Sequence, residues 1–359
     1  MNAAVKYLNR TMLLAMAPFI GILLWLLLTE TAVVLTGAAD PAAGTVPSAP
    51  ANIGMSEQAK AGLEQARGTA VHTRESIQKE MKLYNQTNAE IKEIAELASA
   101  QAQRPLAIYD RKITGKLGKP SATINSDKLR AQLFYLQQDL FKGYAVKIKL
   151  KSDDAMQMVM GGDVLGEAST TLEAVKRHKA AVGVNAGGFA DSRGKRYPLS
   201  TTVLDGKYVN GFEASYKDLF FVGLNENNKL IGGKFTAKDQ LDAKKPKFGA
   251  SFVPVLLRNG RSQTIPDKWK KSPRRAPRTV IANYKDDQLL ILVTDGYNEA
   301  GSSGATLEEL QTMLKSFGAV DAYNLDGGGS SSLVFNGKVI NKPSDGSLRK
   351  LPTHFLFFK

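Results

Sequence analysis

The stretch from Leu289 to Asp326 limits the fold more than any other part of the sequence. It begins with the apolar run LLILVT, continues through TLEELQTMLKSFG, and ends with AVDAYNLDGGG. Thr306 is placed to cap a helix before Glu309, Gly318 is placed to end it, and the runs on both sides are typical of buried strands. A strand–helix–strand unit needs two strands that run parallel or nearly so, which predicts an α+β body whose mixed sheet has α/β portions.

Each of the two predicted strands ends in an Asp-Gly step, at Asp295 and at Asp326. Parallel strands end on the same edge of a sheet, which is where ligands of such sheets collect. Two carboxylates presented together can divide acid, base or nucleophile roles, because their repulsion and surroundings separate their pKa values. We therefore take Asp295 and Asp326 as the candidate catalytic pair; the alternative is that each aspartate only caps a loop.

The glycine-rich run after Asp326 reads GGGSSS and is followed by the hairpin-like SLVFNGKVI. Gly327 and Gly328 allow close backbone approach, consecutive N–H groups in such turns can hold an anion, and Ser330 adds a hydroxyl donor. No Gly-Lys-Ser/Thr follows, so a Walker loop is excluded, and Asn336-Gly337 suits a type I′ turn. The run is therefore predicted to be a binding loop and not a linker.

Two further motifs supply candidate ligand contacts. GVNAGGF follows a short apolar run and presents Asn185, Gly187 and Gly188, although the motif taken alone is equally typical of a simple turn. DKWKKSPRRAPRTV is strongly basic, and most of it is predicted to be a solvated loop. Arg278 differs because it directly precedes the strand-like TVIANY, so we expect its guanidinium to be held firmly enough to grip a phosphate.

The body is predicted to begin near Ser121 and to form one domain over 121–359. Alternating or apolar runs predict strands at YAVKIKLK, AMQMVM, AAVGVN, LFFVGL, ASFVPVLL and TVIANY, and TTLEAVKRH predicts a helix. The stretch from Asn125 to Gly143 has a cap-like start and leucines at helical spacing, so it is predicted to be helical as well.

The N-terminal 1–36 segment predicts a membrane anchor. Lys6 and Arg10 precede an apolar run over 11–28, which is long enough to span a bilayer. The positive-inside rule then gives a single-pass protein of the cell membrane with a cytoplasmic N-terminus and an extracytoplasmic body. A cleaved signal peptide is the alternative.

A flexible linker at 37–55 and a helical stalk at 56–104 are predicted to follow the anchor. The stalk has a narrow apolar stripe made of Ile77, Met81, Tyr84, Ile91 and Ala98. Three polar residues interrupt the heptad pattern: Arg67, Arg74 and Asn88. The stalk is thus either a weak coiled coil or a single solvated helix, which Pro105 is expected to end.

The amino-acid composition limits which cofactors and binding partners the chain can have. The chain has no cysteine and only three histidines, which excludes disulfides and thiolate zinc sites and argues against a histidine-rich metal centre. A net charge of +14 favours an anionic partner. Because the body is predicted to be exported, we expect no nucleic acid partner and look to the cell envelope instead; oligomeric state is left open.

Taken in order, these motifs resemble the phosphodiester glycosidase family, whose bacterial relatives are labelled exopolysaccharide biosynthesis proteins. The matching segments are GVNAGGF, APRTVIA, LLILVTDG, SSGATLEEL, NLDGGGSSSLVFNGKVINKPS and LRKLPTHFLF. The resemblance carries over these motif positions: Asn185, Gly187, Gly188, Arg278, Asp295, Asp326, Gly327, Gly328, Ser330 and Arg349. One position departs, since Tyr297 stands where many relatives have arginine, and this implies altered substrate choice or phosphate binding by Arg278 and Arg349.

The resemblance implies a hydrolase that cuts a sugar phosphodiester at the anomeric carbon and requires no cofactor, with an envelope glycan or exopolysaccharide as substrate. One aspartate would assist attack on the sugar while the other stabilises the oxocarbenium-like charge. Two alternatives remain open. One is a phosphodiesterase or transferase with a divalent cation at Asp295 and Asp326; the other is a non-catalytic protein that binds anionic glycans.

Overall fold

The computed structural model describes residues 57–297 and 303–359. The predicted anchor and linker, residues 1–55, lie outside these ranges. Within them, no helix is both long enough and apolar enough to cross a membrane. The described residues divide into two units, the first containing the chain up to Asn88 and the second running from Ala89 to Lys359.

Helix α2 (Glu57–Leu117) corresponds to the predicted stalk but is longer. It continues through Pro105, so the prediction that this proline ends the helix is wrong. Proline removes one helical hydrogen bond, and contacts further along the helix offset that loss. Ile113 and Leu117 are buried in the core of the body. The ammonium of buried Lys147 donates to the Asp110 carboxylate at 2.6 Å, which fixes the same turns to the sheet.

The largest sheet has eight strands in the order β1-β2-β3-β16-β15-β17-β13-β14. Its strands are β1 (Ala122–Asn125), β2 (Leu129–Gln137), β3 (Lys142–Leu150), β16 (Leu289–Thr294), β15 (Arg278–Asn283), β17 (Ala322–Leu325), β13 (Val255–Arg258) and β14 (Arg261–Ser262). All neighbouring pairs are antiparallel.

Two five-stranded sheets and one separate hairpin complete the strands. The first sheet contains β11 (Leu230–Gly233), β10 (Phe220–Asn225), β12 (Pro246–Phe252), β8 (Val203–Leu204) and β9 (Lys207–Tyr208), in that order. The second contains β19 (Lys338–Val339), β18 (Leu333–Phe335), β5 (Val182–Asn185), β20 (Thr353–Phe357) and β4 (Met156–Met160). The hairpin is formed by β6 (Phe189–Ser192) and β7 (Lys195–Pro198).

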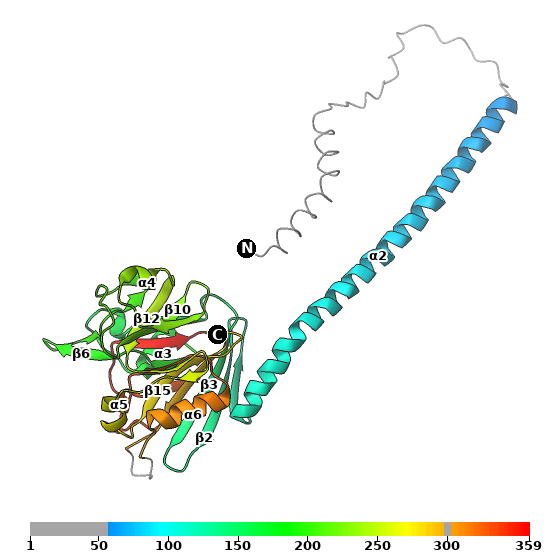
Figure 1. Ribbon diagram of the computed structural model, residues 1–359. Coiled ribbons are helices and arrows are strands. Elements are labelled where there is room, and N and C mark those ends of the chain that lie inside the picture. The colour runs from blue at the N-terminus through cyan, green and yellow to red at the C-terminus, as the bar shows by residue number, and fades with distance from the viewer. Residues whose placement is uncertain (1–56, 298–302) are drawn as a thin grey trace, which may run out of the picture. The chain divides into compact units, whose positions relative to one another are not determined.

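Apolar side chains from all three sheets form one shared core, which includes Val146, Ile291, Val184, Phe355 and Phe220. Helix α6 (Leu307–Phe317) covers the opposite face of the eight-stranded sheet, and α3 (Thr171–His178) packs on the outer side of the β5 sheet (Figure 1). The short helices are α4 (Lys238–Asp242), α5 (Asp267–Lys271) and the 3₁₀ turns η1 (Gly161–Asp163) and η2 (Gly328–Ser330). The α+β class predicted from the sequence is confirmed. The predicted mixed sheet is wrong, because every strand pair in the described residues is antiparallel.

The predicted helix over 125–143 is wrong, because this stretch forms the strand β2 and its turns. Its leucines fit helical spacing, but Leu129, Ala131 and Leu133 also alternate toward the shared core. Nine residue pairs join β2 to β3, so pairing with a distant partner overrides the local pattern.

The strand–helix–strand unit is present, with one difference from the prediction. β16 and β17 run in the same direction, but β15 lies between them and is antiparallel to both. The predicted local signals of the unit are confirmed: Thr306 and Glu309 form a capping box, and Gly318 ends α6 in the left-handed conformation at φ 87°. Asn336 and Gly337 also have positive φ, as the predicted type I′ turn requires.

Candidate active site

Asp326, one of the two predicted catalytic aspartates, lies directly after β17. Its Oδ2 is buried and has no hydrogen-bond partner among the residues described. Burial raises the pKa of Asp326 to about 6, against the opposing influence of the Ser330 hydroxyl and the positive charge of Arg349. A carboxyl group with this pKa is mostly ionised at neutral pH yet close enough to it to exchange a proton during a reaction.

Asn185 fixes the backbone at Asp326. Its Nδ2 donates to the carbonyl oxygen of Asp326 at 2.7 Å, and its Oδ1 accepts from the Thr279 hydroxyl at 2.9 Å and the Ser332 N–H at 3.1 Å. The side chain is fully buried and three of its hydrogen-bonding positions are engaged by the protein. Asn185 was predicted to contact a sugar or phosphate; in this structure its side chain binds groups of the protein itself.

Arg349 and Asp345 form an ion pair against the glycine loop. The guanidinium donates from Nη2 to Asp345 Oδ2 at 2.6 Å and from Nη1 to the Ser330 hydroxyl at 3.3 Å. Gly329 lies so close that a Cβ atom there would meet the Asp345 carboxylate at 2.1 Å and Arg349 Nη2 at 2.2 Å. Only glycine allows this ion pair to lie beside the loop that follows Asp326.

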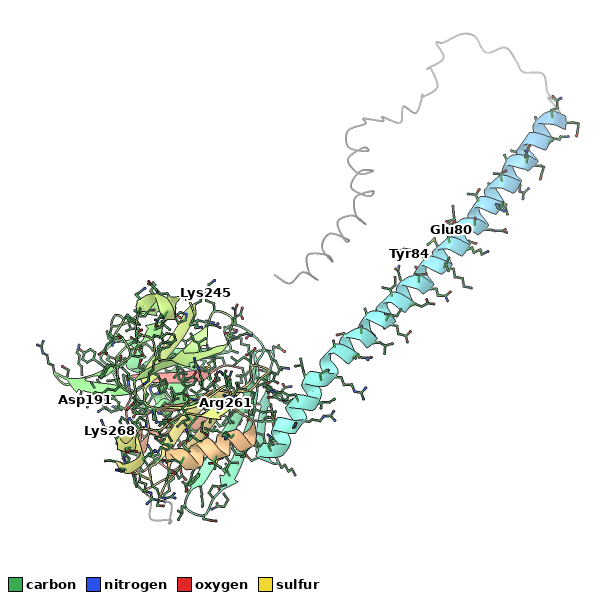
Figure 2. The ribbon with its side chains drawn as sticks, viewed as in Figure 1. Glu80, Tyr84, Asp191, Lys245, Arg261 and Lys268 are labelled. Atoms are coloured by element: carbon green, nitrogen blue, oxygen red, sulfur yellow. The ribbon has the colours of Figure 1, made fainter. Side chains whose placement is uncertain are left out.

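Arg196 is a second cation near Asp326 that the sequence analysis missed. It lies on the β6–β7 hairpin, where it donates to Asp191 from Nε and Nη2 at 2.7 and 2.9 Å and lies 4.1 Å over the ring of Phe189. Its Nη1 donates to the Lys350 carbonyl at 2.5 Å, and its charge acts on Asp326. Figure 2 labels Asp191 at this hairpin.

The hairpin had a sequence signal that could have been used. In DSRGKR, the residues Arg193 and Gly194 both have positive φ, as a two-residue turn between antiparallel strands requires. The turn dipeptide Arg-Gly is less typical than Asn-Gly, and the flanking residues are polar, so this signal for a hairpin is weak.

The N–H groups of the glycine loop are mostly used within the protein. The Gly328 N–H donates to Pro277, the Ser330 N–H to Gly327, and the Ser331 N–H to Gly328. The predicted anion-holding row of consecutive N–H groups is therefore wrong for these three residues. The hydroxyls of Ser331 and Ser332 also face inward and meet Thr279 and Thr171, which leaves Ser330 as the site hydroxyl.

The glycines of the two loops differ in what surrounds them. A Cβ at Gly187 would meet the Ala250 side chain at 2.6 Å and one at Gly188 the Phe252 ring at 2.8 Å, so these residues are small because strand β12 packs on them. Gly328 has φ +59° with nothing within 4 Å of the Cβ position, so its surface is open to a ligand. A Cβ at Gly327 would meet the Pro277 carbonyl oxygen at 2.9 Å.

Asp295 is placed differently from Asp326. It is buried, its Oδ2 accepts from the Tyr144 hydroxyl at 2.7 Å, and its Oδ1 accepts from the Lys342 N–H at 2.7 Å. Burial raises the pKa of Asp295, against these two hydrogen bonds. The intervening β15 separates the two strand ends by about 10 Å at normal strand spacing, and the two carboxylates share no hydrogen-bond partner. The structure does not bring them together as one pair.

Arg278 is firmly held, as predicted, but by carbonyl groups. Its Nε donates to Ala305 at 3.3 Å and its Nη2 to Pro273 at 2.8 Å, and burial lowers its pKa. The aliphatic part of the side chain lies near Gly327. Tyr297 is 53% exposed with φ +56°, and its hydroxyl donates to the Arg275 carbonyl.

The alternative of a divalent cation at Asp295 and Asp326 concerns the same residues. No group of three or more acidic or histidine side chains in the described parts of the chain is arranged to hold a metal ion. The donors next to Asp326 are two arginines and a serine, which suit an anion better than a cation.

Comparison with known proteins places this site in a family. The sequence model of the phosphodiester glycosidase family matches residues 178–358, which contain Asn185, Asp295, Asp326 and Arg349. The chain belongs to the phosphodiester glycosidase family.

The relatives are N-acetylglucosamine-1-phosphodiester alpha-N-acetylglucosaminidases and a bacterial protein. The mouse enzyme is 30% identical over 175 residues, covering 45% of this chain and 33% of that protein, and the human enzyme is 29% identical over 199 residues, covering 52% and 38%. The SPbeta prophage-derived uncharacterized protein YomE of Bacillus subtilis is 29% identical over 183 residues, covering 49% and 28%. The matched region thus spans about a third of each curated relative.

A solved structure is similar in fold. The catalytic domain of the zebrafish N-acetylglucosamine-1-phosphodiester alpha-N-acetylglucosaminidase, auto-inhibited by its pro-peptide, aligns with a TM-score of 0.54 and 21% identity. The alignment covers 67% of this chain and 87% of that one, so the body has the same fold.

Proposed function

We propose that this protein hydrolyses a sugar phosphodiester at the anomeric carbon, with Asp326 as the base. The observation that carries the proposal is the buried, unpartnered Oδ2 of Asp326, whose pKa is raised to about 6 by burial. A general base poised near the working pH is the most effective kind. Family membership and the enzymatic names of the mammalian relatives support the same reaction.

Arg349 and Arg196 are the proposed phosphate-binding residues. Both guanidiniums act electrostatically on Asp326, and each is only partly buried, with side-chain exposures of 35% and 25%. Each now pairs with an aspartate, Asp345 or Asp191. A phosphodiester can replace these carboxylates at the guanidinium forks, because it offers the same planar pair of acceptor oxygens.

In the proposed step, the bond between the anomeric carbon and the phosphate oxygen breaks, and its electron pair leaves with the phosphate. A water oxygen bonds to the anomeric carbon and its proton passes to Asp326. The products are a free sugar and a phosphomonoester. The two guanidiniums stabilise the charge that builds on the leaving phosphate, so no acid has to protonate it.

Asp295 and Asn185 are proposed to position this machinery. Asp295 accepts from the Lys342 N–H, and the segment after Lys342 carries Asp345 and Arg349. Asn185 holds the Asp326 backbone. Gly327, Gly328 and Ser330 form the loop that borders the substrate, Arg278 supports this loop, and exposed Tyr297 takes part in substrate choice.

The substrate is proposed to be a glycan of the cell envelope or an exopolysaccharide, reached from a membrane anchor at residues 1–36. The basic run before Arg278 and the net charge of +14 suit such an anionic polymer. Binding through phosphate must weaken as salt is added, since exposed charges are screened.

The test uses the full chain in detergent with an N-acetylglucosamine-1-phosphodiester. Free sugar plus a phosphomonoester, lost in Asp326→Asn and retained in the matched control Asp295→Asn, would support the proposal. Release of sugar-1-phosphate would mean that the P–O bond is cut and would overturn it. Product of inverted anomeric configuration by NMR would support Asp326 as a base, and retained configuration would make it a nucleophile.

A further inference from the structure

The surface of α2 between Glu57 and Asn88 is not explained by the active site. Every residue in this part of the helix is exposed, including Leu63, Ile77, Met81 and Tyr84, whose exposed fractions range from 52% to 67%. Tyr84 is labelled on the helix in Figure 2. A long helix that leaves large apolar side chains in water has an unpartnered face.

These apolar residues follow a heptad repeat. Leu63, Ala70, Ile77 and Tyr84 recur every seven residues, which defines one column of a coiled-coil seam. The neighbouring column, three residues earlier in each heptad, contains Lys60, Arg67, Arg74 and Met81, and Asn88 continues it in the next heptad. Long arginine side chains can lay their stems along such a seam while the charge reaches water.

We propose that residues 57–88 of α2 pair, parallel and in register, with the same residues of a second copy of this chain. Asn88 supports the parallel order, because a single asparagine in the inner column of a coiled coil fixes register and a two-stranded state. The positions that flank the seam carry no like charges that would face each other: Gln78 lies opposite Thr73 of the other copy, and Asn85 opposite Glu80.

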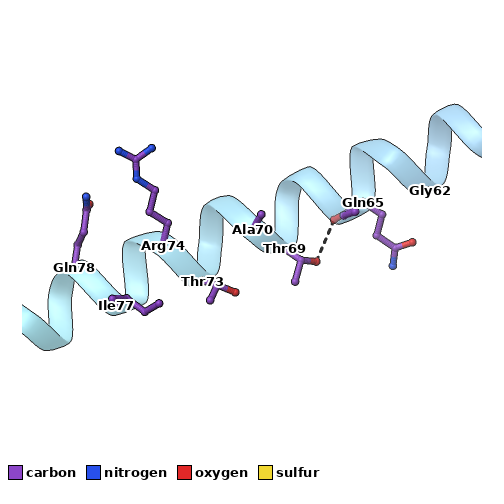
Figure 3. A pocket seen from close by; sticks show the side chains of 9 residues that line it. Gly62, Gln65, Thr69, Ala70, Thr73, Arg74, Ile77 and Gln78 are labelled. Atoms are coloured by element: carbon purple, nitrogen blue, oxygen red, sulfur yellow. Dashed lines mark hydrogen bonds between the residues drawn. The ribbon is translucent and has the colours of Figure 1, made fainter. Parts of the chain in front are cut away.

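The area available matches that of a small specific interface. The four large apolar residues of this part of α2 together expose on the order of 500 Å² per helix, or about 1,000 Å² for a pair. They are Leu63, Ile77, Met81 and Tyr84. This area is near the minimum for a specific protein contact. Figure 3 shows part of this helix, with Ala70, Thr73 and Ile77 labelled on it.

The opposite face of the helix is polar. His72 and Lys79 occupy the position farthest from the seam, where a coiled coil meets solvent. Lys79 is only two residues from Ile77, so the two positions make a matched pair for a test.

The test uses cysteine cross-linking in the full chain, which has no cysteine of its own. Under mild oxidation, Ile77→Cys should form disulfide-linked dimers at least about tenfold faster than Lys79→Cys, because only the seam brings equivalent Cβ atoms within disulfide reach. Equal rates at the two positions, or no dimer from either, would overturn the proposal. The latter result would fit a stripe covered by the N-terminal apolar segment of the same chain.

Orientation is tested with Leu63→Cys and Tyr84→Cys. In the parallel pair each introduced cysteine forms a disulfide only with the same cysteine of the other copy, since residues 63 and 84 lie about 32 Å apart along the helix. Cross-links found only between the two variants in a mixture would mean an antiparallel pair and would overturn the parallel arrangement. The molar mass measured by light scattering should fall from that of two chains to that of one in Ile77→Glu but not in Lys79→Glu. The hydrolytic activity per chain should be unchanged in both variants.

Discussion

Asp295-Gly296 and Asp326-Gly327 are the same dipeptide at matching strand ends, yet the two aspartates do different work. Both carboxyl groups are buried and burial raises the pKa of each. At Asp295 both oxygens accept hydrogen bonds from the protein, whereas at Asp326 one oxygen is left without a partner. Burial alone therefore does not distinguish the two carboxyl groups; the unpartnered oxygen of Asp326 and the two arginines near it do.

The largest expected effect separates the two aspartates by activity. Asp326→Asn removes the proton acceptor and should lower kcat by about 10³-fold. Asp295→Asn keeps a side chain of the same shape, which can accept from Lys342 and donate to Tyr144, and should stay within about tenfold of the parent. Steady-state kinetics of the two variants measure the contrast. Similar losses in both would mean that the carboxylates act as a pair after all.

The next effect concerns the cations beside Asp326. Arg349→Lys keeps the charge but loses the planar fork, so we expect kcat/KM to fall by about 10²-fold, mostly through KM. Arg278→Lys should mainly lower the stability of the fold, because the Arg278 side chain donates to carbonyl groups of the protein. Measuring KM and the unfolding midpoint for both variants distinguishes phosphate binding from structural support. A KM change at Arg278 alone would move the phosphate site to that residue.

A third prediction is thermodynamic. Asp295→Ala leaves the Tyr144 hydroxyl and the Lys342 N–H without their acceptor and opens a cavity, so the free energy of unfolding should fall by about 2–4 kcal/mol. Tyr144→Phe removes only one donor and should cost about 1 kcal/mol. Chemical denaturation measures both. Equal and negligible losses would show that the buried hydrogen bonds of Asp295 contribute little.

The smallest effect is a pH-dependent gain in stability. The Asp326 carboxyl has a pKa of about 6 in the folded protein and about 3.9 when unfolded. It therefore stabilises the fold when protonated, and this contribution is lost as pH rises from 4 to 6. The Asp326→Asn variant does not undergo this loss, so its stability relative to the parent should rise by about 2–3 kcal/mol between pH 4 and pH 7.5. A constant difference across this range would contradict the raised pKa.

Much of the fold was predictable where a local signal agreed with the final packing. The capping box at Thr306, the left-handed Gly318 and the Asn336-Gly337 turn were all predicted from a few neighbouring residues. The stretch from Leu129 to Gln137 was not, because its leucines satisfy both helical and strand spacing and only the distant partner β3 decides between them.

The site was predictable in part for the same reason. Asp326 and its loop are marked by glycines in the sequence, and Arg349 entered through the family resemblance. Arg196 has no such mark, since it acquires its place only when segments far apart in the sequence meet. Asp345 pairs with Arg349 four residues on, but no motif singled it out. The N–H directions of the loop and the inward-facing Asn185 depend on hydrogen bonds that a sequence pattern does not encode.

The position of β20 has a consequence for substitutions far from the site. This strand lies between β5 and β4, and His354 on it pairs directly with Asn185. Because the Asn185 side chain donates to the Asp326 carbonyl, a defect in the pairing of β20 is transmitted through β5 to the proposed base.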